Sequence, residues 1–183
     1  MVHLASIVLA LLLGVLQVAV PQSSPQEPAA GTQIRIEDSR LAGLLPDGLR
    51  RSPTLRSLVE QVQGGRVIVI VQTVRWLPHE AAGILTWIGA GPPNRFVRVS
   101  IKAQASSDAL LALLGHELQH VIEVMSAPWV SDDQSLLALY RQIGQPTNFA
   151  QSAWDSADAR WTGDQVLREL KGLIAGAAAA EER

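Results

Sequence analysis

The sequence predicts an α+β domain in which a short mixed or antiparallel sheet is followed by a run of helices. The β-branched run 67–71 has apolar residues on both faces, as a buried central strand requires. Two further strands, 84–88 and 95–104, are separated by the turn residues Gly91-Pro92-Pro93-Asn94 and predict a hairpin. Because the strands precede most of the helices, the order of elements is typical of α+β folds.

Four helical segments complete the prediction. Ser52-Pro53 and Gly64-Gly65 are start and stop signals around a helical apolar stripe. Serine and aspartate residues at 106–108 and at 131–133 cap the starts of two more helices, the first of which runs to about residue 125. The pattern indicates a last helix over 152–175.

The first 20 residues of this 183-residue chain predict a signal peptide or an N-terminal anchor. Segment 4–20 is uncharged and has two polar side chains, Ser6 and Gln17, which is typical of a secretory signal. Signal-peptide cleavage after Ala19 would place Gln17 at the third position before the cleaved bond, where a small residue is preferred. The alternative that the segment is an uncleaved membrane anchor therefore stays open. Residues 21–33 predict a disordered linker, and 34–183 one periplasmic or extracellular domain that contacts a membrane only through an uncleaved N-terminal segment.

Composition restricts the possible partners and metal ligands. The net charge is −2 and no long run of like charge occurs, so we expect no nucleic-acid partner and favour a small molecule, peptide or protein. Cysteine is absent, which excludes disulfides, a thiol nucleophile and cysteine-ligated zinc. Any metal must therefore be held by histidine and carboxylate.

The segment His116-Glu117-Leu118-Gln119-His120 has the HExxH pattern within the predicted helix 106–125. Histidines four residues apart project from one helix face, so both imidazoles can reach one tetrahedral Zn²⁺. Glu117 lies beside that face, where it can accept a proton from water that the metal activates. The alternative is a pair of core histidines bonded to backbone carbonyls, which is costly beside a buried carboxylate without a metal.

The motif and its neighbours resemble the zincin metallopeptidases, in which uncharged residues surround the two histidines. The matching positions are Leu114, Leu118, Gln119, Val121 and Ile122. The chain is also similar to small, uncharacterised exported bacterial proteins with the same Gly-His-Glu-Leu-Gln-His segment, which are gluzincin-like. In zincins an antiparallel edge strand before the motif helix binds extended substrate, so the resemblance implies that 95–104 forms a cleft wall, with Arg98 and Lys102 toward the cleft.

A catalytic zinc needs a third protein ligand and an open position. No histidine follows His120, so the third ligand must be a carboxylate. The candidates are Glu123, Asp155, Asp158 and Asp164. If 152–175 is one helix, Asp155 lies roughly 50° from the centre of its buried stripe and Asp158 roughly 110°. We therefore predict Asp155 as the ligand, the alternative being a capping box between Ser152 and Asp155.

The roles of three further residues remain open. Glu123 follows His120 by three positions, so we expect it to support that ligand or to form a solvated pair. His79 is the only other histidine of the domain and is expected at the surface. Tyr140, the sole tyrosine, fits either core packing or stabilisation of an oxyanion.

The sequence thus favours an exported zinc hydrolase, most simply a metallopeptidase acting on a peptide or protein with Glu117 as general base. The alternative is a non-catalytic binding or scaffolding module with a structural or degenerate metal site. An iron-carboxylate bundle is excluded because such bundles need the Glu-x-x-His unit twice, and it occurs once.

Overall fold

A computed structural model describes residues 32–147 and 153–173. The predicted signal or anchor, 1–20, and linker residues 21–31 lie outside the described residues. The described residues belong to one compact unit, and its α+β class is as predicted. Within the described ranges, no helix is both long and apolar enough to cross a bilayer.

The main sheet is mixed, with four strands in the order β1-β2-β4-β3. The strands are β1 (Ile34–Ile36), β2 (Val67–Val74), β3 (Gly83–Gly91) and β4 (Asn94–Lys102). β1, β2 and β4 are parallel, and β3 pairs antiparallel with β4 as the predicted hairpin requires. The edge strands are therefore β1 and β3, and the prediction that 95–104 forms the edge was wrong because β4 pairs with β2 on its other side.

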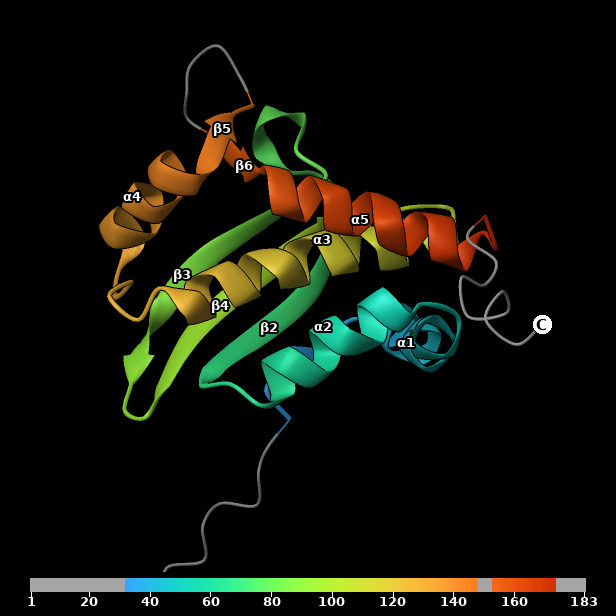
Figure 1. Cartoon of the computed structure of the whole chain (residues 1–183), viewed down its shortest axis with the longest axis horizontal. Helices are drawn as coiled ribbons and strands as arrows, with labels where there is room; N and C mark the ends of the chain where they lie inside the picture. Colours follow the sequence, from blue (N-terminus) through green and yellow to red (C-terminus); the bar gives the residue numbers. More distant parts are fainter. Residues whose placement is uncertain (1–31, 148–152, 174–183) are drawn as a thin grey trace, which may run out of the picture. The chain divides into compact units, whose positions relative to one another are not determined.

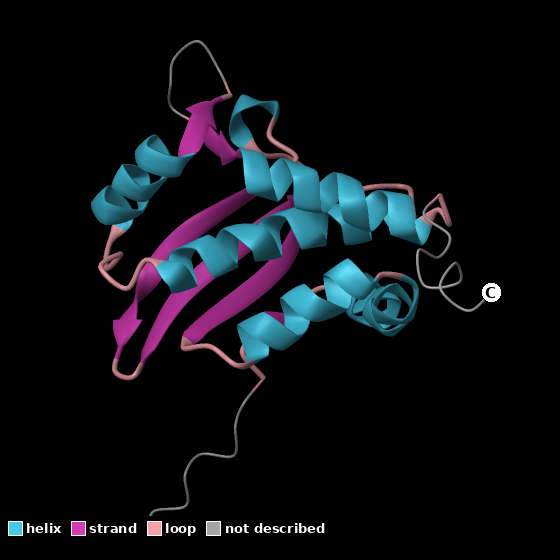
Figure 2. Cartoon of the chain, viewed as in Figure 1, coloured by secondary structure: helices cyan, strands magenta, loops and turns pink. Residues whose placement is uncertain are grey.

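The helices lie against one face of this sheet (Figures 1 and 2). They are α1 (Ser39–Arg51), α2 (Pro53–Gln63), α3 (Ser107–Ser126), α4 (Asp133–Ile143) and α5 (Ala157–Leu170), with a short 3-10 turn η1 (Pro78–Glu80) before β3. Helix α1 was not predicted, because Gly43, Pro46 and Gly48 interrupt its pattern with residues that disfavour helix.

The core lies between the sheet and α3. Alternate residues of the two central strands point at the helices and are fully buried: Val67, Val69, Val71, Val97, Val99 and Ile101. Leu111, Leu114, Leu118 and Val121 of α3 join the same core. Arg98 and Lys102 alternate with the buried positions of β4, so they lie on the opposite face of the sheet.

The last predicted helix is where the structure differs most from the sequence analysis. Its N-terminal part is instead the short strand β6 (Trp154–Ser156), which pairs antiparallel with β5 (Gly144–Pro146). Ser156 caps α5 by accepting a hydrogen bond from Ala159 N at 3.0 Å. Asp155 is therefore a strand residue, and neither the helical-wheel argument nor the capping box with Ser152 applies to it.

Candidate metal centre

Helix α3 carries both histidines and the glutamate of the motif. Ser106 caps its start, and apolar residues around most of its circumference bury the helix in the core. His116 and His120 project from the same face, with ring centroids 5.0 Å apart. Their side chains are 20% and 8% exposed, so one edge of the pair reaches a cleft while the rest is enclosed.

Asp155 meets the two histidines from β6. Its Oδ1 atom lies 3.3 Å from Nε2 of His116 and 3.3 Å from Nε2 of His120. This oxygen is buried and has no hydrogen-bond partner of acceptable geometry. In the metal-free protein this oxygen is balanced only when the imidazoles are protonated and form ion pairs with it, and a metal cation bound by the three atoms can take the place of those protons.

The arrangement fits a tetrahedral zinc site. Atoms that share a tetrahedral Zn²⁺ through bonds of about 2.0–2.2 Å lie about 3.3–3.6 Å apart, and Oδ1 has that spacing to both nitrogens. The three atoms all lie within 4.8 Å of one another. Two neutral imidazoles and one carboxylate are also a donor set of the kind that catalytic zinc uses. His116, His120 and Asp155 can therefore hold Zn²⁺.

Glu117 lies in the same cleft but outside this ligand set. Its side chain is enclosed, with the residue 2% exposed, and its Oε2 atom has no hydrogen-bond partner. Burial raises the pKa of Glu117, an effect that the neighbouring histidines oppose. An enclosed carboxylate with one free oxygen can receive a proton from a bound molecule.

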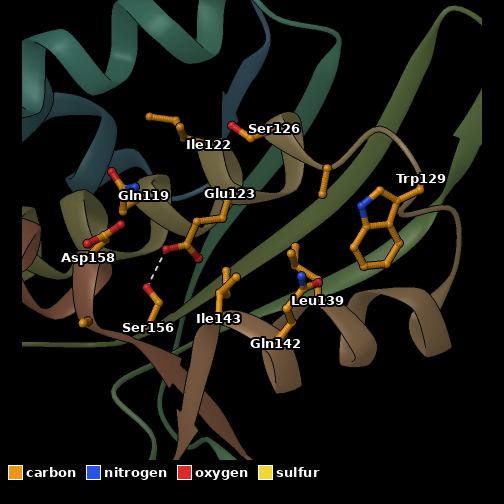
Figure 3. A pocket seen from close by; sticks show the side chains of 12 residues that line it. Gln119, Ile122, Glu123, Ser126, Trp129, Leu139, Gln142, Ile143, Ser156 and Asp158 are labelled. Carbon is orange, nitrogen blue, oxygen red and sulfur yellow. Dashed lines mark hydrogen bonds between the residues drawn. The ribbon is translucent and has the colours of Figure 1, made fainter.

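Glu123 holds the other ring nitrogen of His120. Its Oε2 atom lies 2.7 Å from His120 Nδ1, and its Oε1 atom accepts a hydrogen bond from the Ser156 hydroxyl (Figure 3). A carboxylate on Nδ1 favours the tautomer whose Nε2 is free to bind a metal. The prediction that Glu123 supports His120 agrees with this geometry.

The pKa shifts of the metal-free site also favour a positive charge between the two histidines and the carboxylates. Burial by itself would lower the pKa of His120, but the carboxylates of Asp155 and Glu123 outweigh it and raise the pKa to about 10. Burial would raise the pKa of Asp155, yet the two adjacent imidazoles lower it below its ordinary value. A positive charge is thus strongly favoured at the position where Zn²⁺ would sit.

Two glycines let α5 approach the motif helix closely enough to place β6. A Cβ atom on Gly115 would lie 2.8 Å from Val166 of α5, and one on Gly163 would lie 3.1 Å from the Cβ of His116. Larger residues at either position would separate the helices. Asp155 directly precedes the α5 cap, so this close packing helps to bring it to the histidines.

The other candidate residues lie elsewhere or have other contacts. Asp158 and Asp164 are exposed on α5. Tyr140 is 9% exposed, and its ring packs edge-on against His120 with centroids 5.1 Å apart. Its hydroxyl lies 3.5 Å from the His120 carbonyl oxygen, and Tyr140 also lines the cleft that contains the motif, so both the packing and the oxyanion interpretations stay open. His79 belongs to η1, but its side chain lies outside the described part of the structure.

The motif residues open into a cleft of about 600 Å³, a size typical of ligand-binding sites. Its walls come from η1 and the first half of β3, from α3, from α4, and from β6. Neither Arg98 nor Lys102 lines it, so the expectation that they face the cleft was wrong. β3, and not β4, supplies the strand at its wall.

Two residues of the site were not predicted from the sequence. Gly83 begins β3 and lies against the Glu117 carboxylate, and a lone glycine before a strand gives no signal of such a contact. Ser156 links Glu123 to the start of α5. It could have been found as a helix cap from the pattern Ser156-Ala157-Asp158, which has an acidic residue in the first turn.

A search of protein family models finds no match to this chain, and comparisons with curated proteins and with solved structures also find none. The resemblance of the motif to zincins therefore stays a prediction. The function has to be argued from the chemistry of the site.

Proposed function

We propose that the chain is an exported zinc-dependent hydrolase, a metallopeptidase in which His116, His120 and Asp155 hold the metal and Glu117 is the general base. The observation that carries this proposal is the position of Asp155 Oδ1, which lies 3.3 Å from Nε2 of His116 and 3.3 Å from Nε2 of His120. The two histidines and Asp155 come from segments far apart in sequence, and they converge on one point at the spacing of zinc ligands.

Zinc, when bound, supplies a Lewis acid that lowers the pKa of water to about 7 and polarises a carbonyl. Glu117 does the proton chemistry: its free Oε2 atom faces no competing donor and accepts a proton in the attack step. Because burial raises the pKa of Glu117, the ionised group is a stronger base than an ordinary carboxylate. The protonated group then returns the proton to the leaving amine.

A peptide substrate fits the position of β3. One side of β3 pairs with β4, and among the described residues its other side has no strand partner. Ala82, Gly83, Ile84 and Leu85, at the start of this edge, line the cleft beside the motif. An extended peptide can add to such an edge through main-chain hydrogen bonds, which would bring its backbone past Glu117.

Glu117 also favours a catalytic centre over the alternative of a structural metal site. A structural zinc is closed by four protein ligands, whereas the described residues offer three atoms at metal-ligand spacing. Burying a glutamate that ligates nothing would destabilise a purely structural site without benefit. A general base explains why this carboxylate is enclosed there.

The test is hydrolysis of a mixed peptide library by the zinc-loaded full chain, followed by mass spectrometry. Glu117→Gln should keep the fold and the zinc yet reduce hydrolysis by about 10²- to 10⁴-fold, the usual contribution of a positioned general base. An active Glu117→Gln protein would refute the mechanism. A wild-type protein that binds zinc and cleaves nothing would favour the non-catalytic module.

A further inference from the structure

The cleft beside the motif has an unbalanced charge. Four of its described lining residues are acidic: Glu80, Glu117, Asp133 and Asp155. None of the described lining residues is lysine or arginine. Arg160 lies 3.6 Å from Oδ2 of Asp155, but it does not line the cleft.

Two of these carboxylates have no role in the proposed metal chemistry. Asp155 and Glu117 surround the metal position, where the two positive charges of Zn²⁺ would balance them. Glu80 in η1 and Asp133 in the first turn of α4 are both exposed. Among the described residues neither has a lysine or arginine ion-pair partner, and they lie on two different walls of the cleft.

The backbone conformation of Glu80 supports a role for this wall of the cleft in ligand binding. Glu80 has φ = 54°, in the left-handed region, although it is not a glycine. Such a conformation is unfavourable and is concentrated at ligand-binding and active sites. It occurs here in the turn that leads into β3, directly before the cleft-lining residues Ala81 to Leu85.

The cleft also has an apolar part of its lining. Leu113 of α3, Leu136 and Leu137 of α4, and Ile84 and Leu85 of β3 all line the cleft. Leu137 is 37% exposed, so part of this apolar lining is open to a ligand. A ligand that buries an apolar group there places its adjacent groups beside the acidic residues. Those adjacent groups must therefore be neutral or cationic.

We propose that the cleft selects peptides that carry an apolar side chain next to a cationic group, with Glu80 and Asp133 as the residues that recognise the cation. This specificity rests on the proposed function, since it concerns the substrate of that site. The cation is a lysine or arginine side chain or a free peptide N-terminus, which share the same chemistry. Acidic peptides are disfavoured by repulsion from both walls.

The expected size of the effect follows from the exposure of the two carboxylates. Exposed ion pairs contribute little because water and salt screen them, so we expect a preference of about three- to tenfold for a cationic peptide over its neutral analogue. The preference should weaken as salt rises from about 0.05 to 0.5 M, because the screening length shortens. A preference caused only by side-chain shape would not change with salt.

The experiment measures kcat/KM of the zinc-loaded full chain on peptides with one shared apolar core and a flanking Lys, Gln or Glu. A second series compares free and acetylated N-termini on the Gln peptide, which separates the two sources of the cation. Binding of the same peptides to Glu117→Gln protein, followed by fluorescence anisotropy, gives a readout that needs no hydrolysis.

Glu80→Gln and Asp133→Asn remove each charge while keeping the side-chain size, and thermal unfolding checks that both fold. Asp164→Asn is the matched control, because Asp164 is an exposed carboxylate of α5 outside the cleft. We expect the order Lys, Gln, Glu in wild type and in the control. The double variant Glu80→Gln/Asp133→Asn should show almost no charge preference, so that its kcat/KM values for the Lys, Gln and Glu peptides converge.

The outcomes separate this inference from the proposed function. Hydrolysis without a cation preference, or a preference that survives in the double variant, overturns the inference and leaves the hydrolase intact. Binding with the expected preference but without hydrolysis by wild type supports the inference and overturns the hydrolase. Neither binding nor hydrolysis of any peptide overturns both.

Discussion

Gly83 lies against the carboxylate of Glu117, so closely that a Cβ atom at position 83 would overlap Oε1. The glutamate side chain is flexible and can move away from a methyl group, but only by leaving the position in which it lines the cleft. Gly83→Ala should therefore lower peptide hydrolysis by at least about tenfold, a displacement effect of the kind that misplaced catalytic groups show. Zinc affinity should change little, and thermal unfolding checks that the variant still folds.

The chain offers a matched control for this substitution. Gly89 lies in the same strand, and a Cβ atom there would have nothing within 4 Å. Gly89→Ala should leave hydrolysis unchanged. Equal activity of wild type and Gly83→Ala would show that the placement of Glu117 against Gly83 does not matter for catalysis.

Glu123 should determine how well His120 binds metal. Removing the carboxylate on Nδ1 loses both the preferred tautomer and the fixed ring orientation, so Glu123→Ala should weaken zinc binding by about 10- to 100-fold. Gln119→Ala is the control, because Gln119 lies on the same helix and lines the same pocket as Glu123 (Figure 3), and among the described contacts it has no hydrogen bond to either histidine. Zinc titration with a competing chelator measures both, and identical affinities would contradict the role of Glu123.

The helix that carries the motif could be predicted closely, and the reason is physical. Its cap at Ser106 and its nearly continuous apolar surface are local signals, and the spacing of His116 and His120 fixes their shared face without tertiary information. The third ligand was different. Asp155 does meet both histidines, but the helix on which its choice was based begins only at Ala157.

The β-structure around the site shows what local patterns leave out. β6 has three residues, too few for an alternating pattern to reveal a strand. The edge of the main sheet was misassigned because the pairing of β4 with β2 depends on contacts between residues about 28 apart in sequence, such as Val71 and Val99. Hydrophobic alternation predicts which face of a strand is buried but not which strand lies beside it.

The metal-free protein should lose stability as the pH rises. The pKa of His120 is raised from an ordinary value of 6.5 to about 10, so its charged form stabilises the folded state below pH 6.5. This contribution is lost as the pH rises from 6.5 through about 10. The melting temperature in excess chelator should fall across that range, and a flat or rising profile would contradict the charge pattern described for the site.

The central claim is that His116, His120 and Asp155 bind one zinc ion, and zinc affinity of the full chain tests it most directly. Wild type should bind one zinc per chain. Asp155→Ala and His116→Ala should each weaken binding at least about tenfold, because loss of a ligand should cost no less than loss of a group that only supports one. Asp158→Ala, which removes an exposed carboxylate three residues away, should bind zinc as wild type does. Zinc affinities that are equal in wild type, His116→Ala and Asp155→Ala would contradict the account.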